Sequence, residues 1–522
     1  MGRRGAGGGR LSAIDPRTPV LVGVGQRTVH WTGEGVAPDP AELRADAARA
    51  ALADSGSAGL KAAIDQVLVI RTMADSVPGT PQPFGRCANP PGTLAEDLGL
   101  AEVEAVYSVA GGDQPQALVS EAAEAIFAGE ARAVLIAGSE ATAALKTAMR
   151  LGQALDWSRS SDAAFTDRGL GSRLLSGYEI ANGLGAPTLT YPAFEHALRG
   201  RWGLSRSAHG ALMAELWAGF SAIAAANPHS MFPSARTTEF LATPSAENYP
   251  VADPYLKWHV AQDAVNQGAA VVLTSVGEAD RLGIAPAKRI YLHGYAEAAD
   301  RTPTERPDLS RSRAIELVLG QALASAGKAT ADIALFDLYS CFPCVVLLAA
   351  EALGLDWRAT PATVTGGLPF FGGPGNSYSL HAIATMAEQL RAAPDAFGLI
   401  LANGGFMSKE AAGVYSATQP HARAPVSSAA IVQQIAAEPV PHLIDGPAEA
   451  TIDTYTVAFK KGAPQRGYVI GTTPSGARIL AATARDDAAT LAALLADDPL
   501  GRTAQIAHDG RANIITAIGG AA

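Results

Sequence analysis

A pair of cysteines gives the chain its first candidate chemistry. The motif Cys341-Phe342-Pro343-Cys344 follows the apolar stretch IALFDLYS and opens a predicted helix. Two thiols at this spacing, with a proline between them, are typical of thioredoxin-type redox sites, because the helix N-terminus lowers the pKa of one thiol. A metal site is less favoured, since no second pair of ligands lies nearby in the sequence. The alternative is that both cysteines are small apolar residues packed at the start of a helix.

Two glycine turns offer a different chemistry, the binding of an oxygen atom. One turn spans 110–115 (AGGDQP) and the other 372–378 (GGPGNSY), and each lies between an apolar stretch and a predicted helix. Backbone N–H groups and the positive end of the helix dipole at such a turn suit a carbonyl or phosphate oxygen. No nucleophilic side chain occurs in the first turn, and tight packing of helix on strand would explain its glycines equally well.

Further polar residues lie close to these turns. His381, one turn into the helix after the second glycine turn, could act as a base or could be a packing residue. Asn403-Gly404 ends a buried strand and could present an amide and backbone N–H groups to the same cleft. The histidines between residues 147 and 264 show no ligand spacing, so no metal site is expected. The expected substrate-binding residues are Gly111, Gly112, Gly373, Pro374, Asn376, Asn403 and Gly404.

The elements that must position these residues form a repeat. Residues 107–144 and 364–408 each run from an apolar stretch through a glycine turn and an Ala-rich helix into a buried strand. Alternating buried strands and helices predict an α/β fold with two related halves. Mixed aromatic residues, prolines and charges from about 147 to 264 predict an inserted loop domain. Short β-rich stretches with one helix past residue 426 predict a small C-terminal barrel, OB-like in type.

These changes of pattern set the expected domain boundaries. They are 1–17 for a flexible tail, 18–285 for the first half, about 147–264 for its insert, 286–425 for the second half and 427–522 for the β-rich domain.

Composition restricts the classes of function. The 522 residues are 48% apolar and 17% charged, which is typical of a well-packed α/β protein and not of a disordered chain. The net charge of −10, and the few aromatic residues of the C-terminal domain, do not favour a nucleic-acid partner. Three cysteines are too few for a secreted disulfide framework, and no apolar run of about 18 residues occurs. A cytoplasmic protein without a membrane span is therefore expected.

Five segments, in chain order, resemble the thiolase superfamily, and within it the type 1 thiolase-like group related to sterol-carrier-protein thiolases. The segments are VAGGDQPQALVSEAAEAIFAGEARAVLIAGSE, DAVNQGAAVVLTS, DLYSCFPCVVLLAAEALGL, GGLPFFGGPGNS and LILANGG. The likeness covers roughly residues 18 to 425, and the tail beyond Val426 is similar to that group's additional C-terminal domain. The resemblance implies a duplicated βαβαβ fold with an inserted loop domain.

The resemblance also implies an activity. It is that of an acyltransferase of the acetyl-CoA acetyltransferase type, acting in lipid metabolism with a coenzyme A thioester as its substrate or ligand and no other bound cofactor. It implies a homodimer as well, although the added domain could obstruct the dimer surface.

This chain departs from the family at the reactive positions. The family's reaction forms an acyl-cysteine and then makes or breaks a carbon–carbon bond, which requires a thiolate, an activating histidine, an oxyanion hole and a second cysteine. By position, Gly111 replaces the nucleophilic cysteine, Gly373 the histidine and Ala402 the second cysteine, while Tyr339 falls at a residue of the oxyanion hole. Glycine and alanine cannot take these roles, so the family's usual reaction is expected to be absent.

Three hypotheses of function follow. The first is an acyl-CoA-handling transferase with a rearranged site, in which Tyr339 is the proton donor, Cys341 a relocated nucleophile and His381 a further catalytic group. The second is a non-catalytic acyl-CoA-binding or scaffold protein that recruits a partner protein through the C-terminal domain. The third is a dithiol redox protein that uses Cys341 and Cys344.

Overall fold

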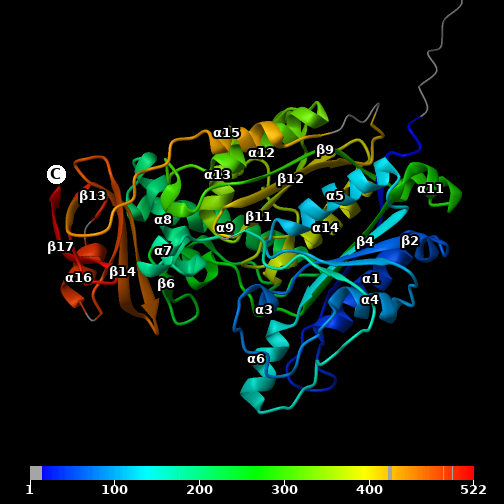
Figure 1. Cartoon of the computed structure of the whole chain (residues 1–522), viewed down its shortest axis with the longest axis horizontal. Helices are drawn as coiled ribbons and strands as arrows, with labels where there is room; N and C mark the ends of the chain where they lie inside the picture. Colours follow the sequence, from blue (N-terminus) through cyan, green and yellow to red (C-terminus); the bar gives the residue numbers. More distant parts are fainter. Residues whose placement is uncertain (1–13, 173, 421–425, 486, 497, 522) are drawn as a thin grey trace, which may run out of the picture.

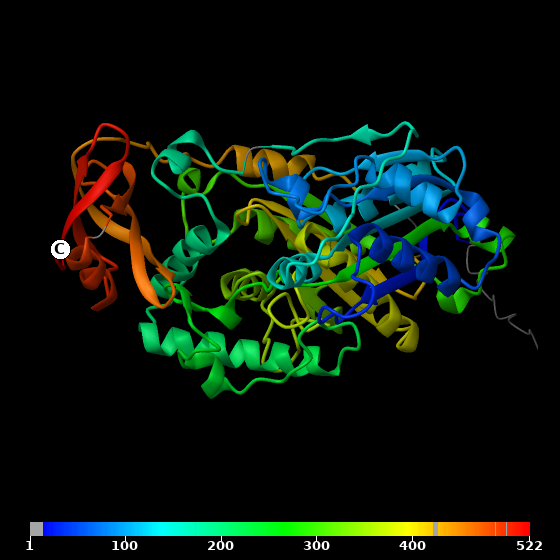
Figure 2. The same ribbon diagram turned by 90° about the horizontal axis from the view of Figure 1, so that it is seen from below.

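The computed structural model describes residues 14–172, 174–420, 426–485, 487–496 and 498–521. These residues form an elongated molecule with a large α/β body at one end and a smaller β-rich domain at the other (Figures 1 and 2). In this described part of the chain, no helix is long and apolar enough to cross a membrane. Most of the expected N-terminal tail, residues 1–13, lies outside the described residues.

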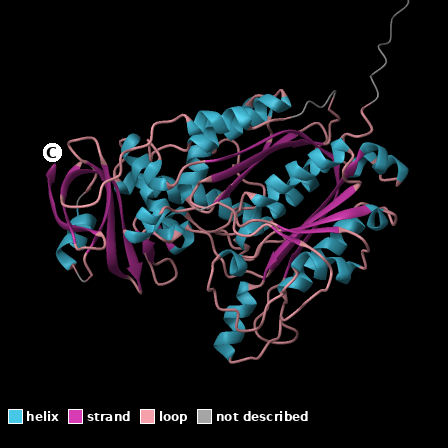
Figure 3. Cartoon of the chain, in the orientation of Figure 1, coloured by secondary structure: helices cyan, strands magenta, loops and turns pink. Residues whose placement is uncertain are grey.

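A ten-stranded mixed sheet runs through the body (Figure 3). In spatial order its strands are β10 (Leu335–Leu338), β11 (Phe397–Gly404), β12 (Lys409–Ser416), β9 (Ile290–Ala299), β1 (Pro19–Thr28), β8 (Gln267–Ser275), β4 (Ala133–Glu140), β2 (Ile64–Val69), β3 (Glu104–Tyr107) and β5 (Thr166–Asp167). Strand β2 is parallel to β3 and β4, and β10 is parallel to β11. The two halves join where β1 pairs antiparallel with β9, through Val20 and Leu21.

Two helices lie between the halves, and they are the helices of the two repeated segments. α5 (Gln114–Ala128) and α14 (Tyr378–Ala392) contact each other and strands of both halves, including β8 and β11 (Figure 1). Pro115 stands in the first turn of α5, where a missing N–H costs no hydrogen bond, and Gly129 ends the helix at a φ of 80°. The predicted α/β fold with two related halves is confirmed.

Other helices cover the outer faces of the sheet. α1 (Pro40–Asp54) packs on β1 and β8, and α12 (Arg313–Ala326) packs on β9 and β12. The remaining helices of the two halves are α2 (Leu60–Ala63), α3 (Met73–Ser76), α4 (Pro90–Leu98), α11 (Val276–Arg281) and α13 (Pro343–Leu353). Short 3-10 helices connect several of these elements, among them η5 (Gly375–Ser377) directly before α14.

The stretch between β4 and β8 contributes elements to both the body and the C-terminal sheet. Its helices are α6 (Thr142–Leu151), α7 (Gly177–Ala181), α8 (Pro187–Arg201), α9 (Arg206–Ala226) and α10 (Thr238–Ala242). Strand β5 of this stretch joins the large sheet, whereas β6 (Pro250–Ala252) and β7 (Tyr255–Leu256) join the C-terminal sheet. The insert is therefore divided between the two parts of the molecule, which the sequence did not predict.

The C-terminal part is a small barrel preceded by α15 (Ala429–Ala436). Its elements are β13 (Ala448–Lys460), β14 (Ala463–Thr472), β15 (Arg478–Thr483), α16 (Ala488–Ala496), β16 (Arg502–His508) and β17 (Asn513–Ala521). The spatial order β14-β15-β17-β16-β13 is closed by pairing of β13 with β14. Closure leaves no free edge along the five strands. The OB-like assignment stays a prediction.

The barrel docks on α8. The guanidinium of Arg199, which is 1% exposed, donates two hydrogen bonds to the carboxylate of Asp498, at 2.6 and 2.7 Å. Helix α8 also packs along β13. On the barrel side, Arg478 donates to the carbonyl oxygens of Thr304 and Pro307 in the body, at 3.2 and 3.1 Å. Partly buried, charge-assisted bonds of this kind fix the relative position of barrel and body.

Candidate active site

A cavity of about 370 Å³ opens between the two halves. The turn before α5, the end of β4, the N-terminal part of α8, the loop after β10 and the turn before α14 all contribute to its wall. The ends of neighbouring strands meet here, at the edge of the sheet where α/β proteins bind their ligands. The residues that line it include Gly112, Glu140, Tyr191, Tyr339, Cys341 and Asn403. Its volume is within the range of small-molecule sites.

The first glycine turn has no room for a side chain. A Cβ atom added to Gly112 would lie 2.5 Å from both the carbonyl oxygen of Asn403 and the hydroxyl oxygen of Tyr339. A Cβ atom added to Gly111 would lie 2.0 Å from Oδ1 of Asp113. The place where the resemblance puts a nucleophilic cysteine is therefore filled by neighbouring groups, and the absence of that cysteine is built into the packing.

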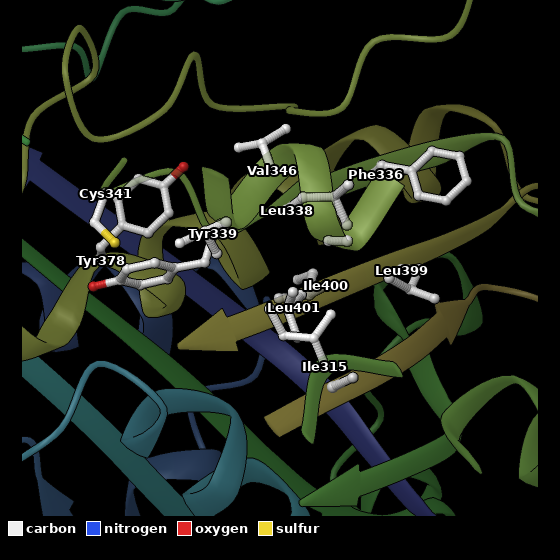
Figure 4. Packing of buried hydrophobic residues seen from close by; sticks show 14 of the residues in the cluster. Ile315, Phe336, Leu338, Tyr339, Cys341, Val346, Tyr378, Leu399, Ile400 and Leu401 are labelled. Carbon is white, nitrogen blue, oxygen red and sulfur yellow. The ribbon is translucent and has the colours of Figure 1, made fainter. Parts of the chain in front are cut away.

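Tyr339 and Cys341 stand beyond the end of β10 (Figure 4). The Tyr339 ring packs edge-on against Tyr378, with ring centroids 5.5 Å apart, and its hydroxyl lies close to Gly112 at the cavity. Nδ2 of Asn403 lies 3.5 Å from Sγ of Cys341 and donates to the hydroxyl of Tyr191 at 3.0 Å. Burial raises the pKa of Tyr339 well above its usual value, so this group is a neutral phenol.

The two thiols of the CxxC motif are also neutral. Burial raises the pKa of Cys341 to about 12, and it also raises the pKa of Cys344 well above its usual value. Both cysteines are free and buried, and Cys344 is 0% exposed. The prediction that the helix N-terminus lowers the pKa of one thiol is wrong, because the cost of burying a thiolate exceeds the effect of the helix end. Neither the redox hypothesis nor a relocated Cys341 nucleophile gains support.

Glu140 is the strongest candidate for acid–base chemistry, and sequence reasoning missed it. Its side chain ends β4 at the cavity and is 5% exposed. Burial, with Asp75 and Asp263 nearby, raises the pKa of Glu140 to about 7, although the backbone N–H of Met73 donates to Oε1 at 2.6 Å. A Cβ atom added to Gly375 would lie 2.4 Å from that same Oε1. The visible signal is an acidic residue directly after seven buried residues of a strand.

His381 lies apart from these groups. It does not line the cavity, and its Nδ1 lies 2.8 Å from Oε1 of Gln26. Its Nε2 is buried without a partner among the described residues. Burial lowers the pKa of His381 to about 3, so the ring is neutral and faces the packed interior. The expected role as a catalytic base is not supported by this placement.

The expected substrate-binding residues divide in a similar way. Gly112, Gly373, Asn376, Asn403 and Gly404 line the cavity, while Gly111 and Pro374 lie directly beside lining residues. Asn376 uses Nδ2 to hold its own turn, donating to the carbonyl of Arg71 and to the hydroxyl of Ser76, both at 2.8 Å. Gly373 has space, since an added Cβ atom would meet nothing closer than 3.3 Å. That these residues bind substrate stays a prediction.

Two further buried carboxyl groups lie behind the first glycine turn. Burial raises the pKa of Asp113, and raises that of Glu410 well above its usual value. Both carboxylate oxygens of Glu410 and Oδ1 of Asp113 have no hydrogen-bond partner among the described residues. Burial therefore favours the protonated form of both carboxyl groups. In the described part of the chain, no group of three or more His, Cys, Asp and Glu residues could hold a metal ion.

Comparison with known proteins places this architecture. The family model of the thiolase-like protein type 1 additional C-terminal domain matches residues 430–511. A search of the curated proteins finds no match. Two solved structures share the fold at low identity. The Ltp2-ChsH2(DUF35) aldolase is 18% identical, with 77% of this chain and 98% of that chain covered and a TM-score of 0.58. The acetyl-CoA acetyltransferase from Syntrophomonas wolfei is 16% identical, with 77% and 99% covered and a TM-score of 0.55.

A third solved structure is much more similar. The monomeric SCP2-thiolase like protein type 1 from Mycobacterium smegmatis has a TM-score of 0.82, and the match covers 100% of that chain. The two chains share the fold along their whole length, including the additional C-terminal domain. With 35% identity over 96% of its own length, this chain belongs to the SCP2-thiolase-like proteins of type 1.

Proposed function

We propose that the cavity binds an acyl thioester and carries out acid–base chemistry at a carbon–carbon bond without forming an acyl-enzyme. The observation that supports this most is a buried carboxyl of pKa about 7, Glu140, in the same cavity as the neutral phenol of Tyr339. A general base works best when its pKa is near the working pH. Cys341, with a pKa of about 12, is protonated at neutral pH and does not act as a nucleophile.

An aldol-type cleavage fits these groups and needs no further reactant. The Glu140 carboxylate takes the proton of a β-hydroxyl group, the Cα–Cβ bond breaks, and an aldehyde or ketone leaves. The electron pair of that bond forms the enolate of the remaining thioester, whose oxygen accepts a hydrogen bond from the Tyr339 hydroxyl. Glu140 then returns the proton to Cα. One structural neighbour is named an aldolase and another an acetyl-CoA acetyltransferase, which supports this class at the level of fold.

The barrel, on this proposal, keeps the cavity in shape. Pro187, Thr188 and Tyr191 in the N-terminal part of α8 line the cavity, and Arg199 at its other end is held by the barrel. Since α8 joins these two contacts, docking of the barrel at one end holds the other end of the helix in place at the cavity. Recruitment of a partner protein through the C-terminal domain stays a prediction, as a second role of the same domain. A homodimer stays a prediction from the resemblance.

The test combines binding, adduct formation and turnover. Thermal shift with coenzyme A, acetyl-CoA and a β-hydroxyacyl-CoA measures binding, and intact mass after each incubation detects an acyl adduct. Chromatography then detects a shortened thioester with an equal amount of carbonyl product. We expect stabilisation, no adduct and turnover of the β-hydroxyacyl-CoA, with turnover reduced at least 100-fold in Glu140→Gln and in Tyr339→Phe.

The other outcomes separate the hypotheses. Detection of an acyl group on any cysteine would contradict the proposal and favour an acyl-transfer reaction instead. Stabilisation of the protein by a thioester, without turnover of any thioester, would favour the hypothesis of a non-catalytic binding protein. No stabilisation by any thioester would remove thioester binding altogether.

A further inference from the structure

A second pocket of about 90 Å³ lies against the far side of the strand end that carries Glu140. Glu140 and Thr142 line both this pocket and the first cavity. Its other walls come from the N-terminus of α1, from α3, from the loop before α4 and from α6, which projects at the lower edge of the molecule in Figure 1. Nothing in the proposed chemistry of the first cavity uses this space.

One wall of the second pocket is apolar and partly aromatic. Phe84 and Trp157 meet edge to face with ring centroids 5.6 Å apart, and Leu145 of α6 lies among the same lining residues. Prolines and alanines of α1, α3 and α4 complete this wall. Flat and compact apolar surfaces of this kind suit a short aliphatic group.

The charged groups of the pocket are partnered, with one exception. Arg86 lies 3.4 Å from Asp75, and Asp39 accepts from the backbone N–H of Ala41 at 2.6 Å. Arg44 of α1 is 2% exposed, and its Nη2 donates a long hydrogen bond to the carbonyl of Pro90 at 3.4 Å. Its Nε is buried and has no partner among the described residues. A buried guanidinium with an unused N–H calls for an acceptor, and a carboxylate matches its geometry.

We propose that the second pocket binds a short aliphatic carboxylate, with the carboxylate on Arg44 and the alkyl group against Phe84 and Trp157. The volume sets the size, because a cavity of about 150 Å³ holds benzene and this one is smaller. Acetate, propionate and butyrate are of the right class. The carboxylate can belong to a free acid or to the end of a larger molecule, and the two sources share this chemistry.

Binding in this pocket is coupled to Glu140. The groups that face Glu140 are Asp75 from α3, Asp263 from the loop before β8, and Arg44 from α1. A bound anion on Arg44 adds negative charge beside Glu140 and favours its protonated form, so it stabilises the acid and suppresses the base. With the pKa of Glu140 at about 7, affinity for the anion should fall about tenfold between pH 6 and pH 8. The second pocket thus acts as an inhibitory sensor of short carboxylates.

Cys87 supplies a direct readout that does not depend on turnover. It lines the second pocket and is half-buried, whereas Cys344 is 0% exposed and Cys341, in the wall of the first cavity, is 8% exposed. The rate of alkylation of Cys87 by iodoacetamide, measured by peptide mass, should fall with increasing butyrate in a saturable way. Butyramide has the same shape without the charge and should not protect. Butyryl-CoA, which has no free carboxylate, should not protect either, and succinyl-CoA tests a carboxylate carried on a larger molecule.

Variants test the role of Arg44. Arg44→Met should weaken butyrate protection at least tenfold, while Arg49→Met, an exposed arginine on the same helix, should leave it unchanged. Leu145→Trp fills the pocket from α6 and tests the same point if Arg44→Met does not fold. Glu140→Gln should keep protection and lose its pH dependence. Protection that survives in both pocket variants, equal protection by butyramide, or no protection by any carboxylate would each overturn the proposal.

Discussion

The buried carboxyl of Glu140 makes a quantitative prediction about stability. In Glu140→Gln the amide keeps the acceptor for the backbone N–H of Met73 and imitates the protonated acid. The pKa of Glu140 is raised from 4.5 to about 7 by folding, so the protonated acid is favoured in the folded state. Its contribution is fully present below about pH 4.5 and is lost as the pH rises to about 7 and beyond. The difference in pKa corresponds to about 3 kcal/mol.

The assay is urea denaturation of wild type and Glu140→Gln at pH 4.5, 6 and 8. Because groups that do not interact with Glu140 titrate alike in both proteins, the difference between their unfolding free energies isolates Glu140 and its coupling to Asp75, Asp263 and Arg44. We expect the variant to gain on the wild type as the pH rises, by about 3 kcal/mol from pH 4.5 to pH 8. Glu130→Gln, at an exposed carboxyl, is the matched control and should show no such trend. A difference that does not change with pH would refute the burial of a titrating acid at this position.

Three further predictions follow from the packing. Gly375→Ala should displace the carboxyl of Glu140 and cost more, by about 1–3 kcal/mol in urea denaturation, than Gly354→Ala, which has a similar positive φ but nothing within 4 Å. Asp498→Asn breaks the ion pair between the barrel and α8, and should lower the unfolding free energy by about 1–3 kcal/mol and speed hydrogen exchange in α8. Native protein at pH 8 should consume one equivalent of alkylating reagent, because Cys341 has a pKa of about 12, and three equivalents after denaturation.

The body of the fold was predictable because its signals are local. The segment 107–144 shows its strand, turn, helix and strand within fewer than 40 residues, and the structure has all four. Strands β5, β6 and β7 were not predictable, because two or three residues carry no periodicity. Their pairings also join distant positions, as where Ala252 of β6 pairs with Ala458 of β13. No pattern in the sequence predicts that contact.

The sequence predicted the position of the site better than it predicted the chemistry of the site. Tyr339 and Asn403 do line the cavity, since Tyr339 directly follows β10 and Asn403 lies near the end of the neighbouring parallel strand β11. The pKa of Cys341 is set by burial, which raises it, and by a smaller opposing effect of Tyr191 of α8, some 150 residues away in the chain, and neither could be read from a helix N-terminus. Glu140 was overlooked for the same reason, because its pKa depends on neighbours from three other segments.

The glycines of the two turns take a different meaning once the site is built. Gly112 leaves room for the Tyr339 hydroxyl, and Gly375 leaves room for the Glu140 carboxyl, since a Cβ atom at either position would lie within 2.5 Å of those oxygens. Each glycine therefore stands against a group that can carry a proton. At Gly111, where the resemblance puts the nucleophilic cysteine, a side chain would have to displace the carboxyl of Asp113, since an added Cβ atom would lie 2.0 Å from its Oδ1. Restoring the cysteine at Gly111 alone should not restore the family's reaction, because the carboxyl of Asp113 would have to move and Gly373 and Ala402 still replace the other two reactive residues.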